Sequence, residues 1–147
     1  MKILLLTLAL SACMLSVEGS VLLSPIPDDY PQWWMEVGQC LEREKNFFDV
    51  EYYVVPGAIT FPCPGGNCYA IHQHGRITVA GERVYDVLTI KHEMIHAYGV
   101  DHPGDSFINP NVVPCQLNGV TSTQIQMVLA PLPLYLMMKD LTHVHQG

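Results

Sequence analysis

The sequence predicts a single α+β domain in which one long helix packs on a short β-sheet. Its 147 residues suit one domain and are too few for two ordinary ones. Hydrophobic residues make up 49% of the chain and charged residues 14%, which permits a packed core and excludes extensive disorder. Strand-like and helix-like patterns also occur along one continuous stretch with no linker between them.

The first half of the mature chain contains one helical pattern and two strand patterns. Residues 20–31 are rich in proline and are expected to be extended. A helix is predicted from Pro31 to about Lys45, because apolar residues recur there at spacings of three and four. Residues 50–55 and 69–80 are predicted as strands, and Gly75 marks a turn or bulge within the second.

The second half holds the longest helical pattern, over residues 84–98. A loop is expected from Gly99 to about Pro114. The final apolar segment, residues 125–141, is interrupted by two prolines and is expected to form a packed helix or a pair of turns.

The charge balance excludes several classes of partner. Acidic residues outnumber basic ones 14 to 7, and the net charge is −7. Binding to nucleic acid requires clustered Lys and Arg, whereas no two basic residues are adjacent here. We therefore expect no nucleic-acid partner and no basic membrane-surface patch. The protein is separately expected to be a monomer.

Residues 1–19 are predicted to be an export signal. One positive charge at Lys2 precedes a short apolar run, which is too short to span a bilayer as a helix. Two endings remain open: Cys13 follows a lipobox-like Leu-Ser-Ala and would be acylated as in bacterial lipoproteins, or cleavage falls near residues 17–19. The mature domain, residues 20–147, would then be a periplasmic, secreted or outer-envelope protein of a bacterium.

The cysteines predict two disulfide bonds. Once Cys13 is acylated or removed, four cysteines remain, and an even number in an exported protein favours disulfides. Cys63 and Cys68 flank a turn-forming Pro-Gly-Gly-Asn stretch, so we expect them to pair. Elimination leaves Cys40 with Cys115. A four-cysteine zinc site is disfavoured because the chain has no CxxC pair.

Residues 92–102, HEMIHAYGVDH, carry the pattern HExxHxxGxxH. His92 and His96 are four residues apart on a helix, so their imidazoles can bind one ion, and Glu93 can reach a water on that ion. Gly99 can end the helix in a left-handed conformation and let His102 supply a third nitrogen. Three protein ligands leave a fourth position for water, which is typical of catalytic zinc.

This segment resembles the extended zinc signature of the metzincin clan of zinc metallopeptidases, in a small exported bacterial form. The resemblance implies a zincin-like fold, with Zn²⁺ bound by His92, His96 and His102. It implies that Glu93 is the general base and that a peptide or protein is the substrate. Metzincins also place a methionine beneath the metal, for which Met127 is the nearest candidate.

The predicted function is therefore peptide-bond hydrolysis by zinc-activated water. The alternative is an exported zinc-binding or envelope module without turnover, although such a site has no use for an unligated carboxylate beside the metal.

Five other residues receive weaker assignments. Asp101 is a candidate partner of the ligands or a substitute for His102 as the third ligand. His72 and His74 lie on one face of a predicted strand, where two positions remain open: above the cleft or, as we expect, exposed on the strand. Tyr85 precedes the motif and Tyr98 lies within it; either could stabilise an oxyanion, but both are expected to pack as aromatic residues.

Overall fold

The computed structural model describes residues 16–101 and 113–121. Within these ranges the chain forms a small single-domain α+β fold with a four-stranded sheet, a two-stranded hairpin and three α-helices. The predicted fold class is therefore confirmed. Most of the expected signal, Cys13 and the expected C-terminal helix over 125–141 lie outside the described residues.

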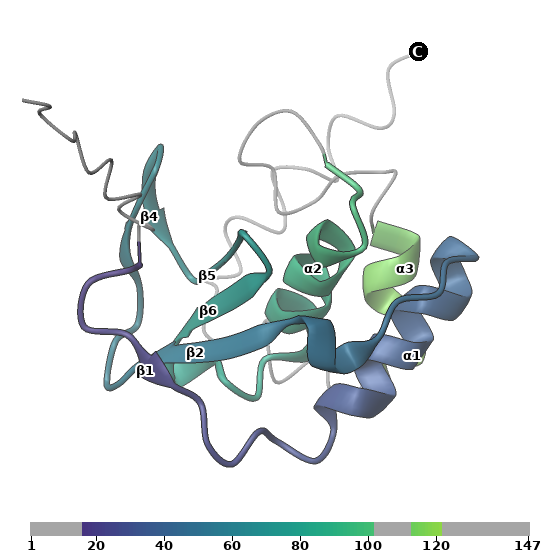
Figure 1. Ribbon diagram of the computed structural model, residues 1–147, viewed down its shortest axis with the longest axis horizontal. Helices are drawn as coiled ribbons and strands as arrows, with labels where there is room; N and C mark the ends of the chain where they lie inside the picture. Colours follow the sequence, from purple (N-terminus) through teal and green to yellow (C-terminus); the bar gives the residue numbers. More distant parts are fainter. Residues whose placement is uncertain (1–15, 102–112, 122–147) are drawn as a thin grey trace, which may run out of the picture.

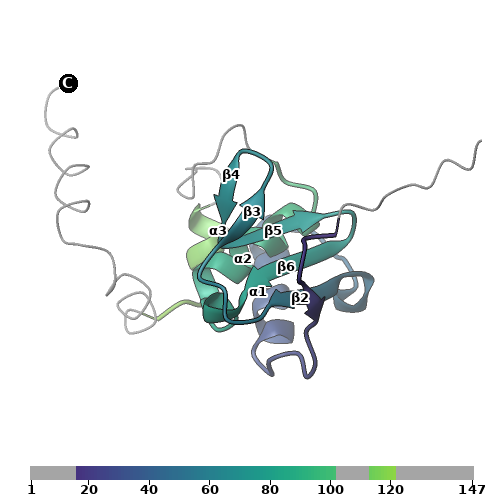
Figure 2. The ribbon, with the colours of Figure 1, turned by 90° about the vertical axis from the view of Figure 1, so that its left-hand side faces the viewer.

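The four-stranded sheet has the order β1-β2-β6-β5. It is built from β1 (Val21–Leu22), β2 (Glu51–Val55), β6 (Arg76–Ala80) and β5 (Ala70–Gln73), and Figure 2 shows its face. β2 and β6 are parallel, whereas both outer strands are antiparallel to their neighbours. The predicted strands and the turn at Gly75 are confirmed, while β1 was not predicted.

The turn between β5 and β6 consists of His74 and Gly75. Both residues have positive φ, 51° and 76°, as a two-residue hairpin turn requires. A second hairpin, β3 (Phe61–Cys63) and β4 (Gly66–Cys68), rises beside β5 in both views (Figures 1 and 2). The Cys63–Cys68 disulfide closes this hairpin, as predicted.

Two helices, α1 (Tyr30–Leu41) and α2 (Val87–Ala97), cover one face of the sheet (Figure 1). A short helix, α3 (Val113–Leu117), packs on both of them, and its first two residues lie within the range where a loop was expected. Two 3₁₀ turns, Phe47–Asp49 and Gly81–Arg83, precede β2 and α2. No helix within the described ranges has both the length and the apolar character needed to cross a membrane.

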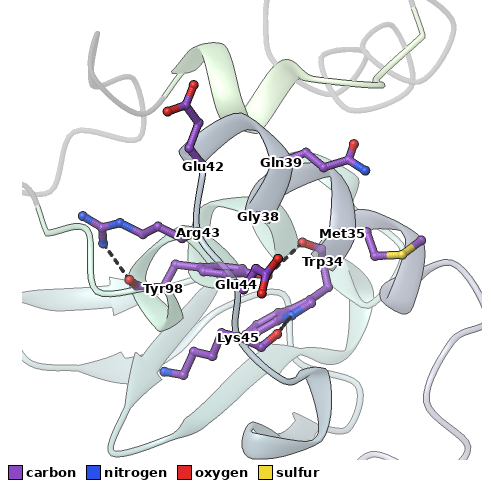
Figure 3. Close-up of a pocket in the computed structure, with 9 residues that line it drawn as sticks. All are labelled: Trp34, Met35, Gly38, Gln39, Glu42, Arg43, Glu44, Lys45 and Tyr98. Atoms are coloured by element: carbon purple, nitrogen blue, oxygen red, sulfur yellow. Dashed lines mark hydrogen bonds between the residues drawn. The ribbon is translucent and has the colours of Figure 1, made fainter.

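α1 is shorter than its predicted range, which extended to Lys45. Glu42 adopts a left-handed conformation with φ of 53°, and its N–H together with that of Arg43 bonds back to the last turn of the helix. This residue is not a glycine, so no C-cap signal marks the position in the sequence. Residues 42–45 consequently leave α1 and lie against the end of α2, beside a cavity of about 390 Å³ (Figure 3).

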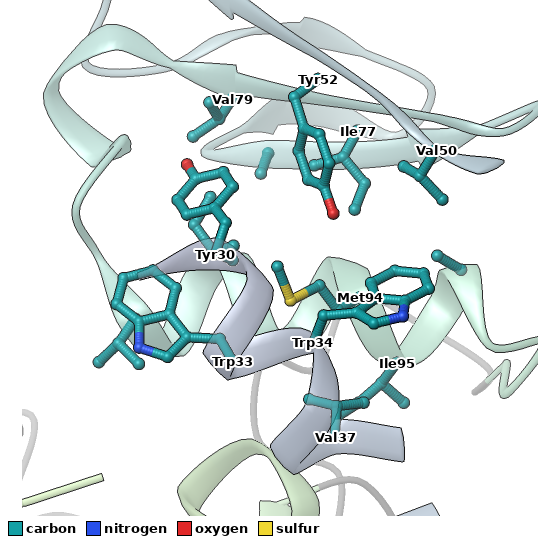
Figure 4. Packing of buried hydrophobic residues seen from close by; sticks show 14 of the residues in the cluster. Tyr30, Trp33, Trp34, Val37, Val50, Tyr52, Ile77, Val79, Met94 and Ile95 are labelled. Atoms are coloured by element: carbon teal, nitrogen blue, oxygen red, sulfur yellow. The ribbon is translucent and has the colours of Figure 1, made fainter. Parts of the chain in front are cut away.

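The core lies between the sheet and the two long helices. Figure 4 shows aromatic and aliphatic side chains of α1 packed against those of the sheet and of α2. Its largest members include Tyr30, Trp33, Trp34, Tyr52, Ile77, Met94 and Ile95. A second disulfide, Cys40–Cys115, joins α1 to α3 with a Cα–Cα distance of 5.3 Å, which confirms the pairing inferred by elimination.

Candidate active site

The start of α2 is fixed by Asp86. Its side chain accepts hydrogen bonds from the N–H groups of Leu88 and Thr89, both at 3.2 Å, and so caps the helix. Arg83 pairs with the same carboxylate at 3.1 Å. Because this cap lies at residue 86, the helix begins at Val87 rather than at residue 84 as predicted.

The end of α2 is formed around Gly99, as the sequence predicted. Gly99 has φ of 82°, its N–H bonds to the carbonyl of His96 at 2.8 Å, and the N–H of Val100 bonds to the carbonyl of Ile95 at 3.3 Å. This pair of bonds is the Schellman motif, which reverses the chain immediately after the helix. The residues that follow His96 are thereby turned back toward its side chain.

His92 and His96 meet on one side of α2. Their Nε2 atoms are 3.2 Å apart. His92 is buried and His96 is partly buried. Two nitrogens that bind one tetrahedral zinc at 2.0–2.1 Å are separated by about 3.3 Å. The spacing therefore fits a shared zinc ion.

The ring of His96 is oriented by the turn after the helix. Its Nδ1 lies 2.9 Å from the carbonyl oxygen of Val100. A carbonyl can only accept, so Nδ1 carries the proton and Nε2 keeps its lone pair toward His92. A hydrogen bond of this kind is the usual companion of a metal-binding histidine.

Glu93 lies next to the two histidines with its side chain buried, since the residue is only 8% exposed. Burial raises the pKa of its carboxyl to about 7, and a hydrogen bond from the main-chain N–H of His72 opposes this rise to a smaller degree. A carboxyl with a pKa near neutrality can take up and release a proton under physiological conditions.

A cleft of about 450 Å³ contains these groups. One wall is formed by residues 63–72, which comprise the disulfide-closed hairpin and β5, and the other by α2 through Thr89, His92, Glu93 and His96. Its described lining contains two carboxyl side chains, Glu93 and Asp101, and no Lys or Arg.

The expectation for His72 was wrong. It shares the helix-facing side of β5 with the core residue Ala70, because side chains two apart point to the same face. His72 is half-buried and lines the cleft. Burial lowers the pKa of its imidazole, with a further contribution from nearby His96. His74 is exposed in the turn, as expected.

Tyr85 and Tyr98 do not line the cleft. Tyr98 packs against Trp34 with ring centroids 4.5 Å apart, and its hydroxyl donates to the Trp34 carbonyl at 3.3 Å, which confirms a packing role. Tyr85 is 78% exposed, so the expectation that it packs was wrong.

Asp101 is the candidate third ligand that lies within the described residues. Asp101 lines the cleft with one carboxylate oxygen 3.4 Å from His96 Nδ1, although its side chain is 93% exposed. His102 and Met127 lie outside the described residues. Within residues 16–101 and 113–121, no three His, Cys, Asp or Glu side chains are grouped closely enough to hold a metal, and two of the three expected ligands fall in these ranges.

The described site thus combines a convergent histidine pair, a buried carboxyl and a cleft bordered by the outermost strand of the described sheet. These groups can bind a metal, move a proton and accept an extended chain. Among known proteins, no family model, no curated protein and no solved structure matches the chain.

Proposed function

We propose that the protein is a zinc-dependent metallopeptidase that hydrolyses peptide bonds. The observation that carries the proposal is the 3.2 Å approach of the Nε2 atoms of His92 and His96, beside the buried carboxyl of Glu93 in one cleft. A purely structural zinc site is closed by four protein ligands and has no role for an adjacent acid.

His92, His96 and His102 would hold the metal, with Asp101 as the alternative third ligand. Bound zinc polarises a carbonyl and lowers the pKa of a coordinated water. The bond between His96 Nδ1 and the Val100 carbonyl prepares this site in the protein itself, because it keeps the ring in the ligating tautomer.

Glu93 acts as the general base and then as the general acid. Its carboxylate takes a proton from the attacking water as the new C–O bond forms at the scissile carbonyl. It then gives that proton to the leaving nitrogen as the C–N bond breaks, which yields a carboxylic acid and an amine. Burial supports this role, because it brings the pKa of Glu93 to about 7.

The main chain of β5 supports a peptide as the substrate. Ala80 N–H donates to the Tyr69 carbonyl across β5 and β6, and in an antiparallel pair such bonds recur at every second residue. The main-chain groups of Ala70 and His72 therefore point away from β6, and the N–H of His72 indeed bonds to Glu93. The remaining groups can pair with an extended peptide laid along the cleft.

The two disulfides support export, since such bonds persist in oxidising compartments. We infer a protein that acts outside the cytoplasm, with a lipid anchor at Cys13 or ordinary signal cleavage as the two possible routes of processing.

The decisive experiment compares wild type with Glu93→Gln on an unstructured protein substrate. We expect Glu93→Gln to keep its zinc and its fold while turnover falls by about 10²-fold or more, because only the proton carrier is lost. Glu82→Gln is the matched control, since Glu82 is exposed and does not line the cleft. Wild-type protein that binds zinc but cleaves no peptide would instead establish the binding-module alternative.

A further inference from the structure

The carbonyl groups at the end of α2 are bonded to two distinct parts of the protein. A helix leaves its last four carbonyls without partners in the helix. Those of Ile95 and His96 are bonded within the turn at Gly99. The other two accept from cationic side chains of the segment after α1: Lys45 Nζ donates to the Ala97 carbonyl at 2.6 Å, and Arg43 Nη1 donates to the Tyr98 carbonyl at 2.8 Å.

The segment that carries these two cations is itself held in place. The N–H of Arg43 bonds to the carbonyl of Gly38 in α1 at 3.0 Å, and the Trp34 indole donates to the carbonyl of Lys45 at 2.8 Å. Figure 3 shows the indole–Lys45 bond and the guanidinium of Arg43 reaching Tyr98. The two side chains therefore extend from a fixed main chain rather than from a free loop.

The bonded carbonyls lie within the part of the chain that orients the candidate ligand. Ala97 and Tyr98 stand between His96 and Val100, and the Val100 carbonyl holds His96 Nδ1 at 2.9 Å. A shift of this turn would move the partner of the His96 ring. It would also move Asp101, which directly follows the turn and lines the cleft.

We propose that Arg43 and Lys45 are positioning residues of the metal centre, which hold the turn at residues 97–100 so that the Val100 carbonyl keeps the His96 ring in its ligating orientation. The inference rests on the zinc site of the proposed function but not on peptide hydrolysis. Neither residue lines the cleft, so both act through the main chain of α2 rather than on the substrate.

A simple capping role would also explain the two hydrogen bonds, because cations stabilise the C-terminal end of a helix. The two roles differ in what they predict for the metal. Capping alone lowers the stability of the fold, whereas positioning also weakens zinc binding in protein that remains folded. Asp86→Ala provides the matched control, since it removes a cap from the same helix at the end remote from Gly99.

The experiment measures zinc affinity by competition with a chromophoric chelator at 25 °C, together with the Tm of the metal-free protein. We expect Arg43→Gln with Lys45→Met to weaken zinc binding about 10-fold or more, as loss of a group that orients a ligand does. Lys45→Arg with Arg43→Lys should restore most of the affinity, because both donors are retained. Asp86→Ala should lower the Tm with the zinc affinity unchanged.

Unchanged zinc affinity in the Gln/Met double variant would overturn the inference, as would an equal loss of affinity in Asp86→Ala at the same loss of Tm. Wild-type protein that binds no zinc would refute both this inference and the proposed function. Wild-type protein that binds zinc without cleaving peptides would refute the peptidase alone, and the affinity comparison would still decide the role of Arg43 and Lys45.

Discussion

His92 and His96 present their Nε2 atoms to each other at 3.2 Å across one turn of α2. We therefore predict that the purified protein binds about one zinc ion per chain and that either His92→Ala or His96→Ala abolishes tight binding, because each removes one of three protein ligands. Metal analysis after dialysis against a weak chelator measures this. Full zinc occupancy in a variant that carries both His92→Ala and His96→Ala would show that the metal lies elsewhere.

The third ligand can be identified by comparing two neighbouring substitutions. We expect His102→Ala to weaken zinc binding strongly and Asp101→Ala to weaken it much less. The side chain of Asp101 is 93% exposed, and His96 Nδ1 already has the Val100 carbonyl at 2.9 Å. The zinc dissociation constants of the two variants are the measurement. The reverse order would assign the third position to Asp101.

The metal-free protein should lose stability as the pH rises from about 4.5 to about 7. Burial raises the pKa of Glu93 from 4.5 to about 7, so within this window the folded state binds more protons than the unfolded chain. Stability is highest below the window and declines across it by on the order of 3 kcal/mol, because the folded state must then bury a charge.

Glu93→Gln should remove this part of the pH dependence, since an amide does not titrate. Denaturant unfolding of both chelator-treated proteins at several pH values measures the difference. If the free energy of unfolding varied with pH in the same way for wild type and Glu93→Gln, Glu93 would ionise without cost in the folded state.

Local signals predicted those parts of the site that depend on neighbours in the sequence. The turn at Gly99 follows from a residue that tolerates positive φ, and the pairing of Cys63 with Cys68 follows from the turn between them. Apolar periodicity alone predicted a helix from residue 84, whereas the side chain of Asp86 caps the helix and starts it at Val87.

Other features depend on contacts between distant residues and could not be found in this way. Lys91 lies in an apolar helical pattern, yet its partner Glu36 is 55 residues away on α1. Arg43 and Lys45 reach α2 from a segment that was predicted to be helical. The cleft position of His72 required the pairing of β5 with β6 and the packing of α2 beneath it.

The buried ion pair gives a prediction about stability. Lys91 is fully buried, and its ammonium contacts the carboxylate of Glu36 and the carbonyl of Asn118. Glu36→Gln should lower the free energy of unfolding by about 3 kcal/mol, because it leaves a buried cation without its counter-charge. Glu36→Gln with Lys91→Met should recover much of this loss. Chemical denaturation of wild type, the two single variants and the double variant tests the coupling, which additive losses would contradict.

The two disulfides should contribute unequally to stability. Cys40 and Cys115 are 75 residues apart in the sequence, whereas Cys63 and Cys68 are 5 apart. If each bond acts mainly by restricting the unfolded chain, the long loop contributes about 4 kcal/mol and the short one about 2 kcal/mol.

Replacing each pair with serines and measuring Tm should therefore show the larger loss for the pair that joins α1 to α3. The short pair closes the hairpin that lines the cleft, so its removal should instead raise KM for peptides while zinc content stays the same. A larger loss of Tm from the Cys63–Cys68 pair would mean that the hairpin, rather than the tie between the helices, limits the stability of the fold.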